Sequence, residues 1–215
     1  MQPLLGIETQ FREACIELDV KNEDVGSIFA VLAPLREKDV ITHLHYLHSL
    51  RVGLLARQIG HFLHHEERPL LIAGALHDLG KCQVCLEVLG KSEGWSAADS
   101  KEIRKHVMNG YRVLRGRFDF SAEIIVWHHR FQHDGYPKRL PPLLHEYSEA
   151  SKLLIVEYGR IIALADVYDA LHRVNDKFGE KRQLSGEEVH EKMLEYNPDR
   201  KKLVTALYDA NIFSV

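Results

Sequence analysis

Apolar residues recur along this chain at the three-to-four-residue spacing of an α-helix, and few segments alternate apolar and polar residues as strands do. This periodicity limits the fold more than any other feature of the sequence. At 215 residues the chain can bury a full core, and no stretch rich in Pro, Gly or Ser separates two periodic regions. We therefore predict an all-α fold, a single helical bundle.

Helix boundaries follow from capping residues, prolines and glycines. One or two helices are expected from residue 7 to residue 35, ending near Pro34. The other predicted helices run from Thr42, as N-cap, to His64; from Pro69, in the first turn, to Gly80; from Ala98 to Leu114; from Ser121 to His129; from Leu153 to Arg173; after a capping box of Ser185 and Glu188; and from Asn197-Pro198 to about Ala210.

Charge and cysteine content exclude several classes of function. Lys and Arg total 28 against 31 Asp and Glu, without a block of like charges, so general nucleic-acid binding is not expected. The N-terminal sequence lacks the pattern of an export signal, and no apolar run is long enough to span a membrane. Three cysteines do not make a disulfide framework, and Cys82-Gln83-Val84-Cys85 lacks the second half of a zinc site. We expect a cytoplasmic protein with structural thiols.

Histidine is abundant, with 14 residues, and its placement carries the chemical information. The pair His77-Asp78 closes an apolar segment; alone, it is explained as well by a helix-end aspartate and a hydrogen-bonded histidine. Asp166 lies within an apolar run, where a lone carboxylate is costly unless it is paired or binds a metal. His48 lies on the apolar face of its predicted helix. These nitrogen and oxygen donors suit a divalent ion such as iron, manganese or zinc.

A second set of candidates comprises His106 and the pair His128-His129. Each has a plain explanation alone, since His106 could be solvated beside Lys105 and two histidines at a helix end could act as a cap. Together with the first set, they place several potential ligands at helix ends or on apolar faces, which favours a metal site.

The order of these motifs resembles the HD superfamily of metal-dependent phosphohydrolases, and within it most closely the HD-GYP branch. The resemblance covers residues 40 to 175. It rests on His48-Ser49-Leu50-Arg51-Val52, His77-Asp78-Leu79-Gly80-Lys81, His106, His128-His129, Asp134-Gly135-Tyr136-Pro137 and Ala165-Asp166-Val167-Tyr168-Asp169-Ala170-Leu171.

The resemblance implies an HD-domain bundle around one or two divalent transition-metal ions, which hydrolyses a phosphate ester through a metal-activated hydroxide. The implied substrate is a small phosphorylated molecule, a nucleotide or cyclic dinucleotide, and a homodimer stays open. Arg51 would be structural, pairing with a carboxylate. The implied roles are metal ligands at His48, His77, Asp78 and Asp166 for one ion and at Asp78, His106, His128 and His129 for a second; catalysis by Asp78 and Lys81; and substrate contact by Lys81, Gly135, Tyr136 and Pro137.

The sequence departs from the branch after its two adjacent histidines, where Arg130 stands in place of a glutamate and the loop before Gly135 is one residue short. A glutamate that holds a third ion in some members is replaced by Leu44, so two ions are expected rather than three. Core packing is expected for Trp95 and Tyr111.

Two other functions stay open: a di-iron oxygenase with the same ligand plan, and a non-catalytic nucleotide-binding signalling module. We divide the single domain into an N-terminal extension (1–39), a catalytic core (40–175) and C-terminal helices packed on the core (176–215).

Overall fold

A computed structural model describes residues 4–91, 93–172 and 183–214, and these residues form helices joined by turns and loops, with no strand among them. The all-α prediction is confirmed. The elements are α1 (Leu4–Glu17), α2 (Asn22–Glu37), α3 (Val40–Phe62), α4 (Glu67–Leu76), the 3₁₀ helix η1 (Leu79–Gln83), α5 (Leu86–Leu89), α6 (Ala97–Ile103), α7 (Lys105–Leu114), α8 (Asp119–Ile125), α9 (Glu149–Leu171), α10 (Gly186–Tyr196), η2 (Pro198–Arg200) and α11 (Lys201–Asp209).

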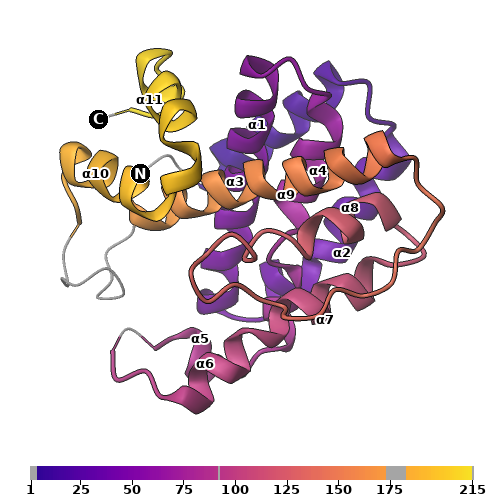
Figure 1. Ribbon diagram of the computed structural model, residues 1–215. Helices are drawn as coiled ribbons and strands as arrows, with labels where there is room; N and C mark the ends of the chain where they lie inside the picture. The colour runs from indigo at the N-terminus through magenta and orange to yellow at the C-terminus, as the bar shows by residue number, and fades with distance from the viewer. Residues whose placement is uncertain (1–3, 92, 173–182, 215) are drawn as a thin grey trace.

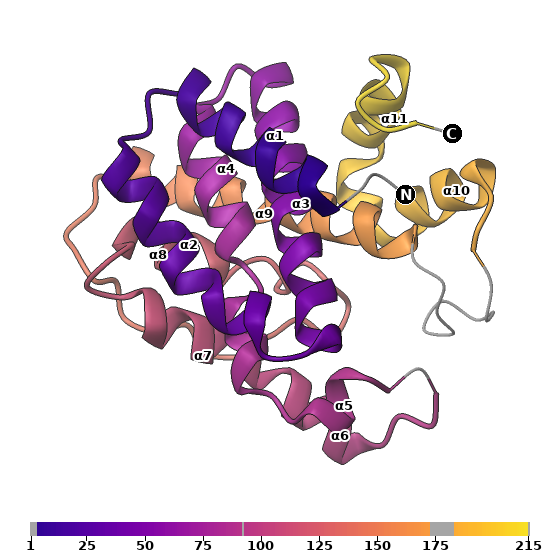
Figure 2. The same cartoon turned by 180° about the vertical axis from the view of Figure 1, so that it is seen from behind.

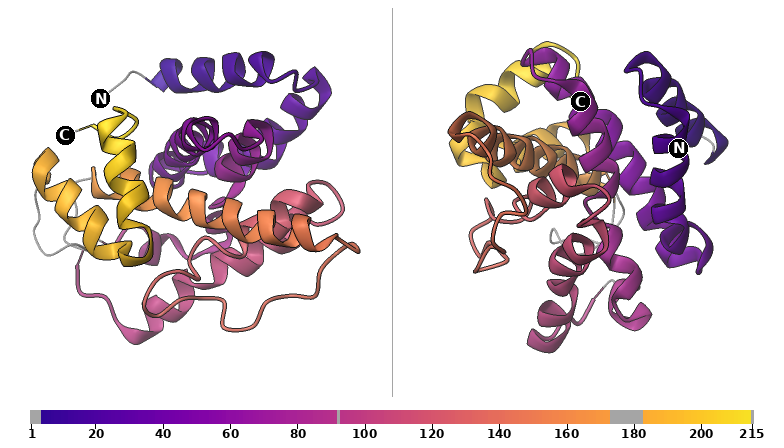
Figure 3. Two further views of the ribbon diagram at one scale, coloured as in Figure 1. Left: turned by 45° about the horizontal axis from the view of Figure 1, so that its top comes forward. Right: turned by 90° about the vertical axis from the view of Figure 1, so that its right-hand side faces the viewer.

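The longest helices, α3 and α9, pack against each other at the centre of the bundle (Figure 1). Helix α4 lies along α3, and α1 and α2 cover them on the side away from α9 (Figures 2 and 3). Helices α7 and α8 pack on η1 and α4, while α10 and α11 lie beside the C-terminal end of α9. Within the described part of the chain, no helix has the length and apolar character needed to cross a membrane.

The start of α3 differs from the predicted one. Asp39, not Thr42, is the N-cap: its carboxylate accepts hydrogen bonds from the backbone nitrogens of Ile41 and Thr42. Thr42 is the N3 residue and its hydroxyl accepts from the Asp39 nitrogen, which completes a capping box. Both residues are good caps, and the side chain that reaches the free N–H groups decides between them. The capping box of Ser185 and Glu188 is confirmed.

Several other predicted boundaries are wrong by three or more residues. Helix α2 continues past Pro34 to Glu37, since a proline in the last turn removes only a backbone bond near the end of the helix. The segment predicted as one helix from Ala98 breaks at Arg104 into α6 and α7, and α8 ends at Ile125 instead of His129. Helix α9 begins earlier, because Ser148 caps it. Its predicted end, Arg173, lies outside the described residues.

The two aromatic residues that we expected in the core differ in their burial. Tyr111 is buried, with 5% of its surface exposed, whereas Trp95 is 40% exposed in the segment before α6. The expectation for Trp95 was wrong because a tryptophan far from a helical apolar face has no core position to fill. Cys15, Cys82 and Cys85 are free thiols.

Buried Arg160 of α9 holds the C-terminal helices in place. Its guanidinium donates to both carboxylate oxygens of Asp199, at 3.0 and 2.7 Å, and to the Asn197 side chain at 3.0 Å. Near the end of α9, Tyr168 stacks on Phe213, with ring centroids 4.2 Å apart. The predicted division into core and C-terminal helices stays a prediction, and its boundary at residues 175–176 lies outside the described residues.

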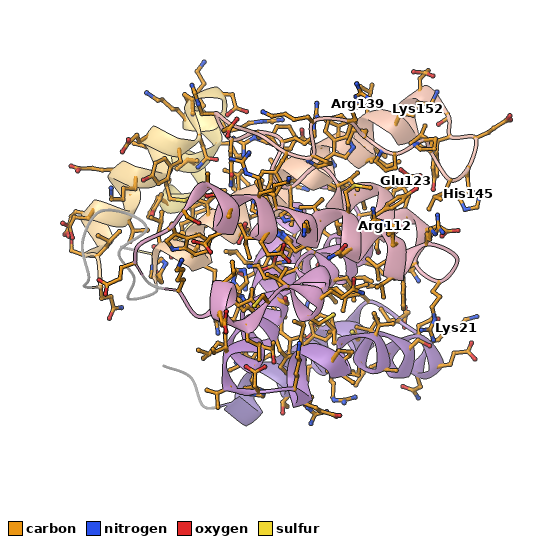
Figure 4. The ribbon with its side chains drawn as sticks, turned by 90° about the horizontal axis from the view of Figure 1, so that it is seen from below. Lys21, Arg112, Glu123, Arg139, His145 and Lys152 are labelled. Carbon is orange, nitrogen blue, oxygen red and sulfur yellow. The ribbon has the colours of Figure 1, made fainter. Side chains whose placement is uncertain are left out.

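Glu123 of α8 is a buried carboxylate outside the set of predicted ligands, and it holds the long segment between α8 and α9. It accepts a hydrogen bond from the Leu144 nitrogen at 2.5 Å. The next residue, His145, donates to Asp119 of α8 at 2.7 Å, and Figure 4 shows Glu123 and His145 at the same end of the molecule. Burial raises the pKa of Glu123.

The raised pKa of Glu123 predicts a pH-dependent stability. A carboxyl whose pKa is higher in the folded chain stabilises it fully below the unfolded-state pKa, and this contribution is lost as the pH rises through the folded-state value. Glu123→Gln should therefore gain stability relative to the unsubstituted chain between about pH 4 and about pH 7. Urea denaturation at both pH values measures this change, with Glu195→Gln on an exposed face of α10 as control. A difference independent of pH would contradict the prediction.

Candidate metal centre

Buried histidine and aspartate side chains from several helices converge between α3, α4, α7, α8 and α9, the elements that meet in the middle of Figure 1. Each is at most 9% exposed. The structure thereby brings together all the ligands predicted from the sequence: His48 of α3, His77 and Asp78 after α4, His106 of α7, His128 and His129 after α8, and Asp166 of α9.

Asp78 lies at the centre of this cluster, with its two carboxylate oxygens facing different histidines. Its Oδ2 lies 3.5 Å from His48 Nε2 and 3.4 Å from His77 Nε2. Its Oδ1 lies 3.3 Å from His106 Nε2. One carboxylate can therefore serve two adjacent cation positions.

On the first side, His48, His77 and Asp78 offer ligand atoms that all lie within 4.8 Å of one another. Asp166 adds an oxygen 3.1 Å from His48 Nε2 and 3.8 Å from His77 Nε2. Ligand atoms of Asp166, His77 and His128 also lie within 4.8 Å of one another. The ligands predicted for the first ion are thus adjacent, although no single group contains all four.

On the second side, Asp78, His106, His128 and His129 each offer one ligand atom, and these four atoms all lie within 4.8 Å of one another. The Nε2 atoms of His106 and His128 are 3.4 Å apart. Two imidazole nitrogens that approach so closely beside a carboxylate are placed to share a cation. This group matches the set predicted for a second ion.

Hydrogen bonds at Nδ1 orient the histidines. The Nδ1 atoms of His77, His106 and His128 lie 2.7, 2.6 and 2.5 Å from the backbone oxygens of the residues three positions earlier. A carbonyl only accepts, so each of these rings carries a proton on Nδ1 and turns its Nε2 toward the cluster. The Nδ1 of His129 lies 3.0 Å from the side-chain amide of Gln132.

His48 has a different partner, a carboxylate that the sequence did not identify as part of the site. Asp169 Oδ2 lies 2.6 Å from His48 Nδ1. Arg51 donates to both oxygens of Asp169, at 2.5 and 3.0 Å. Arg51 therefore has the expected carboxylate partner. The sequence holds a weak signal for Asp169, which lies one helical turn after Asp166 on α9.

Both central aspartates stay ionised. Burial opposes this, but Lys81 and His77 outweigh it and hold the pKa of Asp78 well below its usual range. For Asp166, the neighbouring imidazoles of His48 and His77 outweigh burial and hold the pKa well below its usual range. The cluster therefore holds buried negative charge, which requires positive charge close by.

The histidines divide into neutral and charged groups. Burial lowers the pKa of His106 to about 4, and burial with its histidine neighbours lowers the pKa of His128 to about 3. Burial also opposes charge on His77, but Asp78 outweighs it and the pKa rises to about 10. Neutral imidazoles next to carboxylates that attract a positive charge are the electrostatic setting of a cation site.

Two buried polar atoms also fit a metal ion. Among the described residues, none forms a hydrogen bond with His77 Nε2 or Asp78 Oδ1. Buried polar atoms without such a bond are rare and call for a ligand or ion. Imidazole nitrogens and carboxylate oxygens are the donors that iron, manganese and zinc accept.

The predicted substrate-contact residues surround this cluster. Lys81 of η1 places Nζ 2.5 Å from Asp78 Oδ2 and 3.4 Å from His45 Nδ1. Tyr136 stacks on the His129 ring, with centroids 4.6 Å apart and planes at 25°. Gly135 and Pro137 flank it in the loop. Whether these loop residues touch a substrate stays a prediction.

Glycines let the backbones that carry the ligands approach one another. A Cβ on Gly53 of α3 would lie 2.7 Å from the Leu71 oxygen of α4, so only a glycine allows this crossing. Gly80 was predicted as the stop of α4 but lies inside η1. A Cβ there would overlap the His106 oxygen and lie 2.5 Å from the Gly110 nitrogen. Gly80 thus brings α7, and with it His106, up to Asp78.

Comparison with known proteins gives a family match. The family model described as HD domain matches residues 46–171. The crystal structure of the HD domain of the Listeria monocytogenes phosphodiesterase PgpH has a TM-score of 0.53 and 16% identity, and the match covers 79% of this chain and 83% of that one. This likeness supports the fold.

Three curated relatives are similar in sequence. The cyclic di-GMP phosphodiesterase response regulator RpfG of Xanthomonas campestris is 30% identical, with 79% of this chain and 43% of RpfG covered. The 3′3′-cGAMP-specific phosphodiesterase 2 of Vibrio cholerae is 32% identical, with coverage of 58% and 23%. The cyclic di-GMP phosphodiesterase of Thermotoga maritima is 26% identical, with coverage of 84% and 50%. The chain spans half or less of the length of these relatives.

The contact at Gly80 predicts a coupled loss of stability and of geometry. Gly80→Ala should lower the free energy of unfolding by about 1–3 kcal/mol, the usual cost of overpacking, because α7 must move away from η1. Metal binding by the His106 side of the cluster should weaken with it. Urea denaturation and metal titration measure the two effects.

Gly26→Ala in α2 is the matched control, since a Cβ there meets no atom within 4 Å. It should leave stability unchanged or raise it slightly. Equal stability of the Gly80→Ala chain and the unsubstituted chain would contradict the close packing of η1 on α7.

Proposed function

The chain belongs to the HD domain family, and we propose that it is a metal-dependent phosphodiesterase of the HD-GYP branch. The observation that carries this proposal is the buried carboxylate of Asp78, whose two oxygens face two separate histidine groups. The relatives described as cyclic dinucleotide phosphodiesterases support both the branch and the reaction.

We propose two divalent ions, of the iron, manganese or zinc class. His48, His77, Asp78 and Asp166 would hold the first, and Asp78, His106, His128 and His129 the second. When bound, such ions make water nucleophilic near neutral pH and neutralise charge on the phosphoryl oxygens. The neutral state of His106 and His128 suits this role, because metal binding requires an unprotonated imidazole nitrogen.

Side chains of the protein would orient the substrate and balance the charges of the metal centre. Asp78 would bridge the two positions. Lys81, 2.5 Å from Asp78 and with 13% of its side chain exposed, would share its positive charge between that carboxylate and the substrate phosphate. The loop of Gly135, Tyr136 and Pro137 would line the substrate side of His129.

A cyclic dinucleotide is the proposed substrate. Its phosphodiester suits a centre that neutralises charge on both the attacked and the leaving oxygens. The altered loop after His129, with Arg130 instead of a glutamate, lies beside the proposed substrate contacts, so preference among cyclic dinucleotides is expected to differ from that of the relatives. We further propose the division into residues 1–39, 40–175 and 176–215.

Metal content and turnover test the proposal together. Anaerobically purified protein should contain about two transition-metal ions per chain, and His106→Ala about one. Asp78→Ala should lose both ions and reduce hydrolysis of cyclic di-GMP and 3′3′-cGAMP by at least about 100-fold, because it removes the shared ligand. Elemental analysis and product chromatography measure these effects.

His145→Ala is the control, because His145 is an exposed histidine paired with Asp119 outside the cluster. It should keep both metal and activity. Normal turnover in Asp78→Ala would refute the proposed centre. One ion unaffected by His106→Ala would indicate a mononuclear enzyme. Uptake of oxygen without phosphodiester cleavage would indicate the oxygenase alternative, and nucleotide binding without metal the signalling module.

A further inference from the structure

The ring of His48 lies between two carboxylates from a single helix. Its Nε2 faces Asp166 Oδ1 at 3.1 Å, on the side of the cluster, and its Nδ1 faces Asp169 Oδ2 at 2.6 Å, on the opposite side. Asp166 and Asp169 lie one turn apart on α9, so they project from the same face of that helix. The imidazole ring is fully buried. A side chain of α9, Asp169, therefore fixes the orientation of this ring.

This arrangement distinguishes His48 from the other histidines with a fixed Nδ1. His77, His106 and His128 use backbone oxygens of nearby residues, which any sequence supplies. His48 depends on one side chain that is 121 positions away in the sequence. A charged acceptor also forms a stronger hydrogen bond than a neutral carbonyl and makes the ring a better electron donor at its other nitrogen.

Arg51 fixes that acceptor in turn. It lies one turn after His48 on α3 and donates two bonds to Asp169. This fork leaves Oδ2 positioned for His48 and balances the charge of a carboxylate whose side chain is only 12% exposed. The contacts form a chain from Arg51 through Asp169 to His48, with α3 and α9 each contributing at fixed spacing.

We propose that Asp169, clamped by Arg51, is the positioning residue of the first metal position. It fixes the proton of His48 on Nδ1 and thereby presents the Nε2 lone pair to the ion that Asp78 and Asp166 would also hold. This inference rests on the proposed function, since it assigns a role toward the ion that His48 would hold. Asp169 does not contact that ion in this scheme and acts only through His48.

Titration of metal-free protein with Mn²⁺ against a competing chelator tests the role of Asp169, because the two positions can be measured separately. Asp169→Leu removes the acceptor and should lower the affinity for the first ion by about 10- to 100-fold, the usual effect of losing a hydrogen-bond partner of a metal ligand. Asp169→Asn keeps an oxygen acceptor without charge and should give a smaller loss. The ion lost in His106→Ala should bind normally in both variants.

A matched pair of arginine variants separates positioning from general stability. Arg51→Met and Arg160→Met each break a two-bond arginine–aspartate contact, but Arg160 pairs with Asp199, which belongs to none of the ligand groups. Both substitutions should lower stability in urea, whereas only Arg51→Met should weaken binding of the first ion. In the Co²⁺-loaded protein, the exchangeable Nδ1–H signal of His48 in the proton NMR spectrum should disappear or exchange faster in Asp169→Leu.

The possible results are distinguishable. Unchanged first-ion affinity in Asp169→Leu, or equal losses in Arg51→Met and Arg160→Met, would overturn the positioning role while leaving the hydrolase proposal intact. Loss of both ions alike in Asp169→Leu would also overturn it, since the residue would then be merely structural. Failure of the unsubstituted protein to bind any Mn²⁺ would overturn the proposed function, and this inference with it.

Discussion

The arrangement of the bundle depends on keeping one carboxylate, Asp78, ionised while it is almost completely buried. Such a group is costly unless positive or hydrogen-bonding groups surround it. Lys81 supplies charge from the same turn, and histidines approach from α3 and α7. These side chains can reach Asp78 only because helix backbones come into direct contact, at Gly53 between α3 and α4 and at Gly80 between η1 and α7. Close helix packing and the charge balance of the centre are therefore one requirement.

Helix ends solve a second problem, the orientation of the histidines. The last carbonyl groups of a helix have no backbone partner within it. His77 follows α4, His106 follows the break after α6, and His128 follows α8, and each lies near the oxygen of the residue three positions earlier. One contact therefore caps a helix and fixes a ring. This explains why the break at Arg104 and the early end of α8, both missed from periodicity, occur beside ligands.

The sequence predicted the identity and grouping of the candidate ligands because their types, order and apolar surroundings are local properties. Burial of Asp166 in an apolar run already implied a partner. The sequence assigned no role to Asp169, although the motif from Ala165 to Leu171 contains it, since that role depends on α3 and α9 crossing at one place. It also misread Gly80 as a helix stop, because a glycine required by a neighbouring backbone looks the same in sequence as one required by a turn.

The loop after His129 shows how the protein can vary around a constant centre. Although this loop is short and lacks the glutamate usual in the branch, it folds back on the histidine: Gly135 donates to the Gln132 oxygen at 2.9 Å and Tyr136 to the His129 oxygen at 3.3 Å. A Cβ on Gly135 would lie 2.8 Å from the Arg130 carbonyl carbon, so the tight return requires glycine. Tyr136 thus stacks on His129 despite the changed sequence. Because the candidate ligands keep their supports beside this loop, we expect the loop to affect which phosphodiester fits rather than whether ions can be held.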